Sequence, residues 1–216
     1  MQHIRQLIAG GESQTLEFKY ELNSARRISQ TISAFSNTRG GILLIGVKDN
    51  GALAGVRMDE ELYVLEAGAS MYCNPPVELK IKQHHVEGKQ ILEVKIEESS
   101  KKPVLSEYEP ETFKAWVRIG ASNRMASPVH LNLWQYSSQI SRKPADFTEK
   151  QQRILSNLNE KKSLTLNQLC RLSKLPRNAV VQSLADFIRW ELISCEPEIS
   201  GGFVFSLVGQ KQQPAA

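Results

Sequence analysis

The chain has 216 residues, a net charge of +4, and 41% hydrophobic and 23% charged residues, which is the composition of a globular protein. Its longest apolar run, GILLIGV, is far shorter than the roughly 20 residues of a membrane-spanning helix, and the N-terminal stretch lacks a signal-peptide pattern. The cysteines, Cys73, Cys170 and Cys195, are odd in number and widely spaced, which excludes a zinc motif and a regular disulfide framework. We therefore expect a cytoplasmic protein with reduced thiols and no membrane partner.

The first part of the chain predicts alternating helices and strands. Ile28, Ile32 and Phe35 recur at helical spacing and give one predicted helix a buried face. The elements expected in chain order are a helix over residues 3–10, a strand around 16–20, a helix over 25–37 and a strand over 42–47.

The next segment predicts another helix and a hairpin. Asp59 is expected to cap a helix that runs to about Cys73, where Asn74-Pro75-Pro76 stops it. Two alternating stretches, VELKIKQHHV and QILEVKIEE, flank a Glu87-Gly88-Lys89 turn and are typical of a β-hairpin. With a further strand over 113–119, these elements predict an α+β fold in which helices flank a mixed sheet.

The last third predicts a small winged helix-turn-helix domain. Thr148 opens a helix, a second helix closes near Ser173, and Pro176 stands at the start of a third, where its missing N–H is tolerated. Strands over 192–195 and 203–208 follow, and three helices followed by a hairpin is the plan of this motif.

Polar residues and Pro144 interrupt the apolar periodicity between these two parts, which indicates a linker. The expected domains are residues 1–136, a linker over 137–147, the small domain over 148–210 and a disordered tail over 211–216.

The third helix of the small domain carries residue types that contact nucleic acid. Arg, Asn and Gln side chains bind base edges and phosphates. Residues 171–182 hold three basic and no acidic side chains, so a positive patch is expected. The alternative is a solvated helix in a domain used for dimerisation or protein contact. The candidate contacts are Lys174, Arg177, Asn178, Gln182 and Arg189.

Three carboxylates form the candidate chemical site of the first domain. Glu17 lies in a predicted strand, Glu12 lies just before it, and Asp49 follows the GILLIGV strand. If these strands are neighbours the acids converge, and such carboxylates bind Mg²⁺ or Mn²⁺, which activates water against a phosphodiester. The alternative assigns Asp49 to its Asp-Asn-Gly turn and pairs Glu17 with Lys19 or Arg39.

Glycines follow the second predicted helix at Gly40 and Gly41. They fit either a helix C-cap or a backbone loop that approaches a phosphate. The sequence has no G-x-x-x-x-G-K-[ST] stretch, so ATP binding by a P-loop is not supported.

Five stretches, GESQTLEFK, AFSNTRGGILLIGVKDNGALAG, NPPVELKI, SSKKPV and WVRIGASNRMAS, occur in an order and spacing that resemble the Schlafen AlbA-type domain, formerly described as a divergent AAA module. The resemblance spans about residues 6–130. It implies binding of DNA or RNA, and many bacterial members are described as transcriptional regulators. Some Schlafen proteins are metal-dependent endoribonucleases with two glutamates and one aspartate, which the resemblance places at Glu12, Glu17 and Asp49.

One departure from those nucleases matters. They pair two Schlafen lobes, whereas this chain carries one, and a homodimer is one way to supply the second. The leading expectation is therefore a DNA-binding transcriptional regulator that needs no cofactor for binding. The alternative is an endoribonuclease that acts on structured RNA with Mg²⁺ or Mn²⁺. The phosphate contacts expected in the first domain are Lys19, Arg26, Arg27, Arg118 and Arg124.

Overall fold

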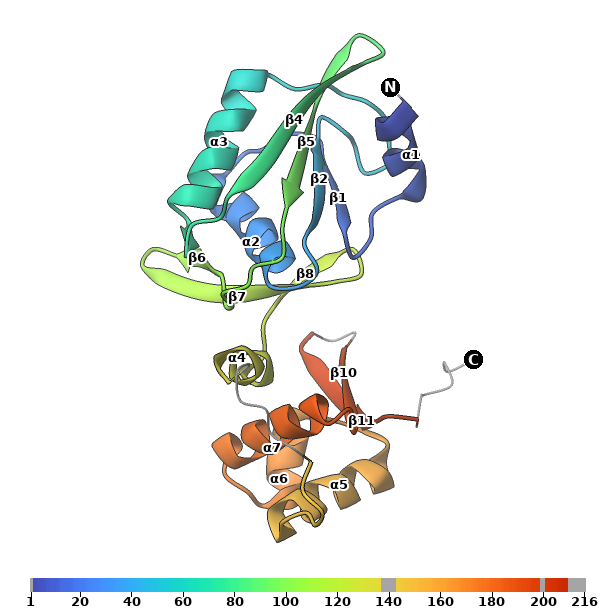
Figure 1. The fold of residues 1–216 in the computed structure, drawn as a ribbon, viewed down its shortest axis with the longest axis vertical. Helices are drawn as coiled ribbons and strands as arrows, with labels where there is room; N and C mark the ends of the chain where they lie inside the picture. Colours follow the sequence, from blue (N-terminus) through green and yellow to red (C-terminus); the bar gives the residue numbers. More distant parts are fainter. Residues whose placement is uncertain (1, 137–142, 199–200, 210–216) are drawn as a thin grey trace. The chain divides into compact units, whose positions relative to one another are not determined.

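The computed structural model describes residues 2–136, 143–198 and 201–209 (Figure 1). The chain forms two compact units, Met1–Met125 and Ala126–Ala216. The division falls earlier than the expected boundary at residue 136, because helix α4 (Pro128–Gln135) packs on a helix of the second unit. Residues 137–142 of the expected linker and the expected tail over 211–216 lie outside the described residues.

A mixed four-stranded sheet is the core of the first unit, in the order β1-β2-β5-β4. The pair β1-β2 is parallel, and β5 runs antiparallel to both of its neighbours. The β4–β5 hairpin turns at Glu87 and Gly88, which both have positive φ, as a two-residue hairpin loop requires. The expected α+β architecture with a mixed sheet is confirmed. The strands are β1 (Leu16–Lys19), β2 (Gly41–Ile45), β4 (Leu79–Val86) and β5 (Lys89–Ile96).

Helices cover both faces of this sheet. Ile4 of α1 (Gln2–Gly10) packs with Leu16, Phe18 and Leu44 on one face. The other face is covered by α2 and α3, which share a larger apolar cluster with strands β2 and β5 (Figure 1). These helices are α2 (Ala25–Ser36) and α3 (Met58–Ser70).

The start of α3 differs from the sequence expectation. Arg57, not Asp59, is the N-cap residue, and no side chain makes a capping hydrogen bond there. Asp59 lies instead inside the first helical turn, where a carboxylate stabilises the positive end of the helix dipole.

A second, antiparallel sheet in the order β3-β6-β7-β8 packs against α2, and β3, β6 and β8 were not expected. The hydroxyl oxygens of Ser29 and Ser106 lie 2.8 Å apart, and Ser33 Oγ donates to the carbonyl of Val104 at 2.7 Å. Small polar side chains thus let α2 approach this sheet closely. The strands are β3 (Cys73–Asn74), β6 (Leu105–Glu109), β7 (Thr112–Ile119) and β8 (Ser122–Met125).

The second unit combines four helices with a three-stranded sheet in the order β10-β11-β9. Thr148 caps the first expected helix through a capping box, and Pro176 is the N-cap of the third. Helix α4 and strand β9 were not expected. The further elements are α5 (Glu149–Lys161), β9 (Ser163–Thr165), α6 (Leu166–Ser173), α7 (Arg177–Arg189), β10 (Ile193–Pro197) and β11 (Phe203–Leu207). Every helix in the described ranges is too short or too polar to cross a bilayer.

Candidate nucleic-acid interface

Glu17 is the centre of a buried polar cluster in the first unit. It lies on β1 and is only 4% exposed. One carboxylate oxygen accepts from Nζ of Lys19 at 2.7 Å and from Oγ1 of Thr31 at 3.3 Å. The other oxygen accepts from the guanidinium of Arg118 and from Nδ2 of Asn123 at 3.3 Å. A buried carboxylate is tolerated because two cations and two neutral donors satisfy it.

Arg118 of β7 is equally buried and fully engaged. It is 2% exposed, and its guanidinium donates twice to the carbonyl of Ser13 and lies 5.0 Å from the ring centre of Phe35. Burial lowers the pKa of Arg118, while the carboxylates of Glu17 and Glu12 oppose that shift. The expectation that Arg118 contacts phosphates is therefore corrected, because its donors are used within the chain.

A pocket of about 450 Å³ opens beside this cluster, between the end of β1, the start of α2 and strand β8. Lys19, whose side chain is 40% exposed, and the exposed Arg27 line it. Ser24 caps α2 at the same place by accepting from the backbone N–H of Arg27 at 3.3 Å. A phosphate in this pocket would meet two cations and the positive end of a helix dipole, alongside the carboxylates of Glu17, which is paired with Arg118 and Lys19, and Glu21.

The other expected cations of the first domain lie outside this pocket. Arg26 faces away, with its guanidinium 3.7 Å from Glu107 and 5.7 Å from the ring centre of Tyr72. Arg124 is partly buried on β8. Of the five cations expected to contact phosphate, Lys19 and Arg27 are thus the two that the structure brings together.

Glu12 bonds the backbone of the chain, whereas Asp49 lies in an exposed turn. An oxygen of Glu12 accepts from the backbone N–H of Phe18 at 2.8 Å. Asp49 is exposed in the turn after β2, and Asn50 makes the side-chain bond of that turn by accepting from the N–H of Ala52 at 3.1 Å. The side-chain hydrogen bond of the Asp-Asn-Gly turn therefore comes from Asn50 and not from the carboxylate of Asp49.

The expected metal site at Glu12, Glu17 and Asp49 does not fit this arrangement. Within residues 2–136, 143–198 and 201–209, no three His, Cys, Asp or Glu side chains are grouped so as to hold a metal ion. Glu17 is also already neutralised by Arg118 and Lys19. Of the pairings weighed from the sequence, the contact of Glu17 with Lys19 is the one observed.

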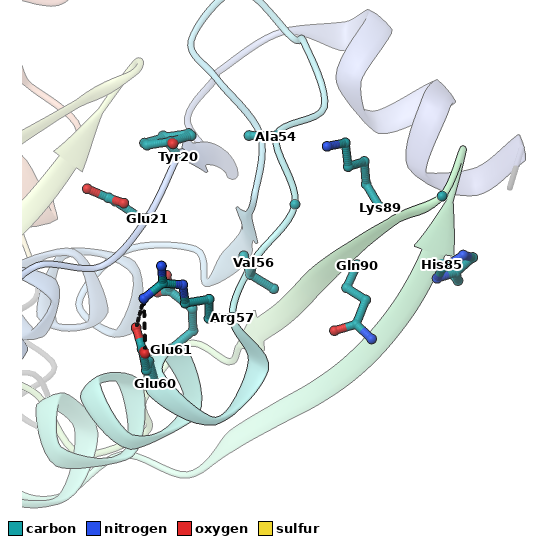
Figure 2. A pocket seen from close by; sticks show the side chains of 12 residues that line it. Tyr20, Glu21, Ala54, Val56, Arg57, Glu60, Glu61, His85, Lys89 and Gln90 are labelled. Carbon is teal, nitrogen blue, oxygen red and sulfur yellow. Dashed lines mark hydrogen bonds and ion pairs between the residues drawn. The ribbon is translucent and has the colours of Figure 1, made fainter.

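A larger pocket of about 630 Å³ lies elsewhere on the first unit (Figure 2). Tyr20 and Glu21 line one side, hairpin residues line the other, and Arg57 bonds Glu60 at 3.3 Å. Burial raises the pKa of the Glu61 carboxyl here, although a backbone N–H bond opposes that shift. Three glutamates and two cations, Arg57 and Lys89, line it, whereas the Lys19 pocket, which shares Glu21 with it, has two glutamates and two cations and suits a polyanion better. Sequence reasoning missed this site because its residues come from separate stretches of the chain.

In the second unit, three of the expected nucleic-acid contacts lie in exposed positions at the end of α6 and the start of α7. Lys174 ends α6 in the left-handed conformation, with φ of 52°. Arg177 and Asn178 form the first turn of α7, and Nη1 of Arg177 donates to the side chain of Asn167 at 2.6 Å. All three are exposed, as expected from the sequence.

The remaining two expected contacts are engaged with α4. Gln182 accepts from Nδ2 of Asn132 at 3.1 Å, and Nη2 of Arg189 donates to the carbonyl of Asn132 at 3.1 Å. Arg189 also pairs with Asp186 at 3.0 Å, and its side chain is only 16% exposed. The expectation that Arg189 is a surface contact is corrected. Arg189 is covered because α4, a helix that the sequence pattern did not predict, packs against α7.

Comparison with known proteins agrees with this fold. The family model described as "Schlafen, AlbA_2" matches residues 12–127, more than half of the chain. The DIP2311 protein of Corynebacterium diphtheriae is 15% identical with a TM-score of 0.50, over 74% of this chain and 39% of that one. This chain thus spans about two fifths of that protein, and the likeness shows the fold alone.

A second solved structure is the N-terminal domain of a protein from Nitrosomonas europaea described as related to the ATP-dependent DNA helicase RecG. It is 23% identical with a TM-score of 0.40, over 68% of this chain and 95% of that one. Among curated proteins, none matches this chain. The family match supports contact with nucleic acid.

Proposed function

The chain belongs to the Schlafen AlbA_2 family, and on this premise we propose that it is a DNA-binding regulator of transcription in the cytoplasm. The second unit would act as a winged helix whose α7 approaches duplex DNA. Its order from α5 onward, a helix, the short strand β9, two further helices and a hairpin, supports this assignment. The family match lies almost wholly in the first unit, so the second unit is argued from its own residues.

The observation that carries the proposal is the exposed polar end of α7. Lys174, Arg177 and Asn178 are all exposed within five residues of sequence, and no acidic residue lies between 171 and 182. Recognition helices in this kind of domain use their N-terminal residues to contact base edges, while nearby cations grip phosphates. In this chain the same positions hold two cations and an amide.

The pocket of Lys19 and Arg27 would supply a further phosphate contact from the first unit. Glu17 holds the ammonium group of Lys19 at 2.7 Å, so this cation needs little ordering on binding. A phosphate contact of this kind adds affinity without sequence preference.

Salt-dependent binding of duplex DNA tests the proposal. We expect fluorescence anisotropy to show binding that weakens steeply with salt, since phosphate contacts release counterions. Arg177→Ala should weaken binding at every salt concentration and reduce the slope of log affinity against log salt by about one. Lys150→Ala, which removes an exposed cation of α5, is the matched control and should bind as the wild type does. Absence of binding at low salt, or equal binding by Arg177→Ala, contradicts the proposal.

The endoribonuclease alternative rests on the motif shared by Glu12, Glu17 and Asp49. We do not prefer it, because Glu17 is paired within the chain and the three carboxylates are not grouped. Its test is incubation of transfer RNA with the protein and Mn²⁺. Cleavage by the wild type that Asp49→Ala abolishes, with RNA binding kept, would establish the alternative.

A further inference from the structure

The face of α7 that points away from its own core is partly covered by another helix of the same unit, and Gln182 on that face remains exposed. Val180 and Leu184 face the core and are completely buried. Gln182, Ala185 and Arg189 lie on the opposite side, at positions i, i+3 and i+7, and therefore form one stripe. Ala185 is nonetheless fully buried, and the two polar residues beside it bond α4.

Asn132 of α4 makes the specific contacts. Its side-chain amide donates to Gln182 and its backbone carbonyl accepts from Arg189. These are the chemical roles that a base edge and a phosphate would play towards the same two side chains, since glutamine bonds bases and arginine bonds phosphate oxygens. The helix thus uses the hydrogen-bonding groups of α7 that nucleic acid would require.

The docked position of α4 is stabilised at its N-terminal end. Ser127 caps the helix in a capping box with His130. The ring of His130 lies 4.6 Å from that of Phe203 on β11, and Val129 is fully buried. However, α4 has eight residues, and so short a helix has little stability apart from its tertiary packing.

We propose that α4 is an intramolecular competitor of nucleic acid: it occupies the outward face of α7, and full-affinity binding of duplex DNA requires it to move away. The proposal rests on the DNA-binding function proposed above and adds a regulatory state to it. A chain whose binding-competent form is a minor population has its affinity reduced by that fraction. Any change that weakens the α4–α7 contact therefore tightens DNA binding.

Variants of α4 that leave α7 intact test this. Asn132→Ala removes the bond to Gln182, and Val129→Ala weakens the apolar contact. Gln135→Ala, an exposed position on the same helix, is the matched control. We expect Asn132→Ala to bind duplex DNA about 2- to 10-fold more tightly than the wild type, the ratio that corresponds to one hydrogen bond. Val129→Ala should also bind more tightly, and Gln135→Ala should not differ. Circular dichroism checks that each variant is folded.

Two outcomes separate this inference from the proposed function. If the wild type binds DNA through Arg177 but Asn132→Ala and Val129→Ala bind no more tightly, α4 is not a competitor and the proposed function stands. If none of these proteins binds DNA, both fail. Hydrogen exchange of residues 128–135 gives an independent measurement. Faster exchange in the DNA complex supports release of α4, whereas slower exchange means that α4 belongs to the interface and overturns the inference.

Discussion

Arg118 and Glu17 form an ion pair that is almost closed to solvent and joins β7 to β1 across 101 residues of sequence. Glu17 in turn holds the ammonium group of Lys19 at 2.7 Å, at the edge of the pocket. A buried interaction thereby determines where a surface cation lies. The order of residues in the motif GESQTLEFK reflects this arrangement, since the carboxylate and the lysine are two positions apart on one strand and share a face.

The first prediction concerns this pair. Arg118→Met should lower the free energy of unfolding by about 3–5 kcal/mol, because it leaves the buried carboxylate of Glu17 without its main partner. Urea denaturation measures the change. Lys114→Met, at an exposed position of the same strand, should change it by less than about 0.5 kcal/mol. If Arg118→Met is as stable as this control, the ion pair does not hold the two strands together.

The second prediction concerns the close approach of another backbone segment to Gly40. Its φ is +66°, and an added Cβ would lie 2.6 Å from the carbonyl oxygen of Ile96. Gly88 has a similar φ of +74° but has free space around it. Gly88→Ala should thus cost about 1–2 kcal/mol, the penalty of the left-handed conformation, and Gly40→Ala should cost clearly more. Equal losses in urea denaturation would show that the close approach of the backbone is unimportant.

The third prediction concerns the thiols. Burial raises the pKa of Cys73 and of Cys195 to about 12. Because the thiolate is the reactive form, both should react slowly with a thiol-specific reagent at pH 8. Cys170 and Cys195 are both half-buried, and since the raised pKa slows the reaction of Cys195, Cys170 should react first and Cys170→Ser should remove the fast phase of labelling. A fast phase that persists in this variant would mean that one of the other two thiols is accessible.

The fourth prediction is a pH dependence of the second unit. Burial lowers the pKa of His130 to about 4 from its usual 6.5. The unfolded chain therefore binds a proton that the folded chain does not, and stability falls as the pH drops from 6.5 towards 4. From pH 7 to pH 5 the loss should be about 2 kcal/mol. His130→Gln should reduce this loss. Urea denaturation at pH 7 and at pH 5 measures it, with hydrogen exchange of α7 as the readout for unfolding of the second unit. An unchanged pH dependence in the variant would contradict the assignment to His130.

Long and regular patterns predicted the fold well. The alternation around Glu87-Gly88 predicted the β4–β5 hairpin, and the capping residue Thr148 predicted the start of α5. Strands β6 and β8 and helix α4 were missed because they are short and lack a clear period. Their stability comes from packing, as in the bonds of Asn132 to α7.

The candidate site was predicted in part. Lys19 and Arg27 meet in one pocket, and Arg177 and Asn178 are exposed together. The burial of Arg118 was not foreseen, because a sequence shows that an arginine is charged but not that its partner lies on a distant strand. The same pairing of Glu17 with Arg118 explains why Glu17, the buried member of the expected metal site, is already neutralised within the described residues.

The guanidinium of Arg118 is a cation that belongs to the chain itself, so it neutralises Glu17 whatever ions the solution contains. A carboxylate that depends on a divalent ion from solution changes its charge balance with metal concentration, whereas Glu17 does not. The free energy of unfolding of the first unit should accordingly be the same in a metal chelator as in Mg²⁺ at matched ionic strength. The charge of Glu17 beside this pocket is thus balanced by side chains of the protein and not by ions from solution.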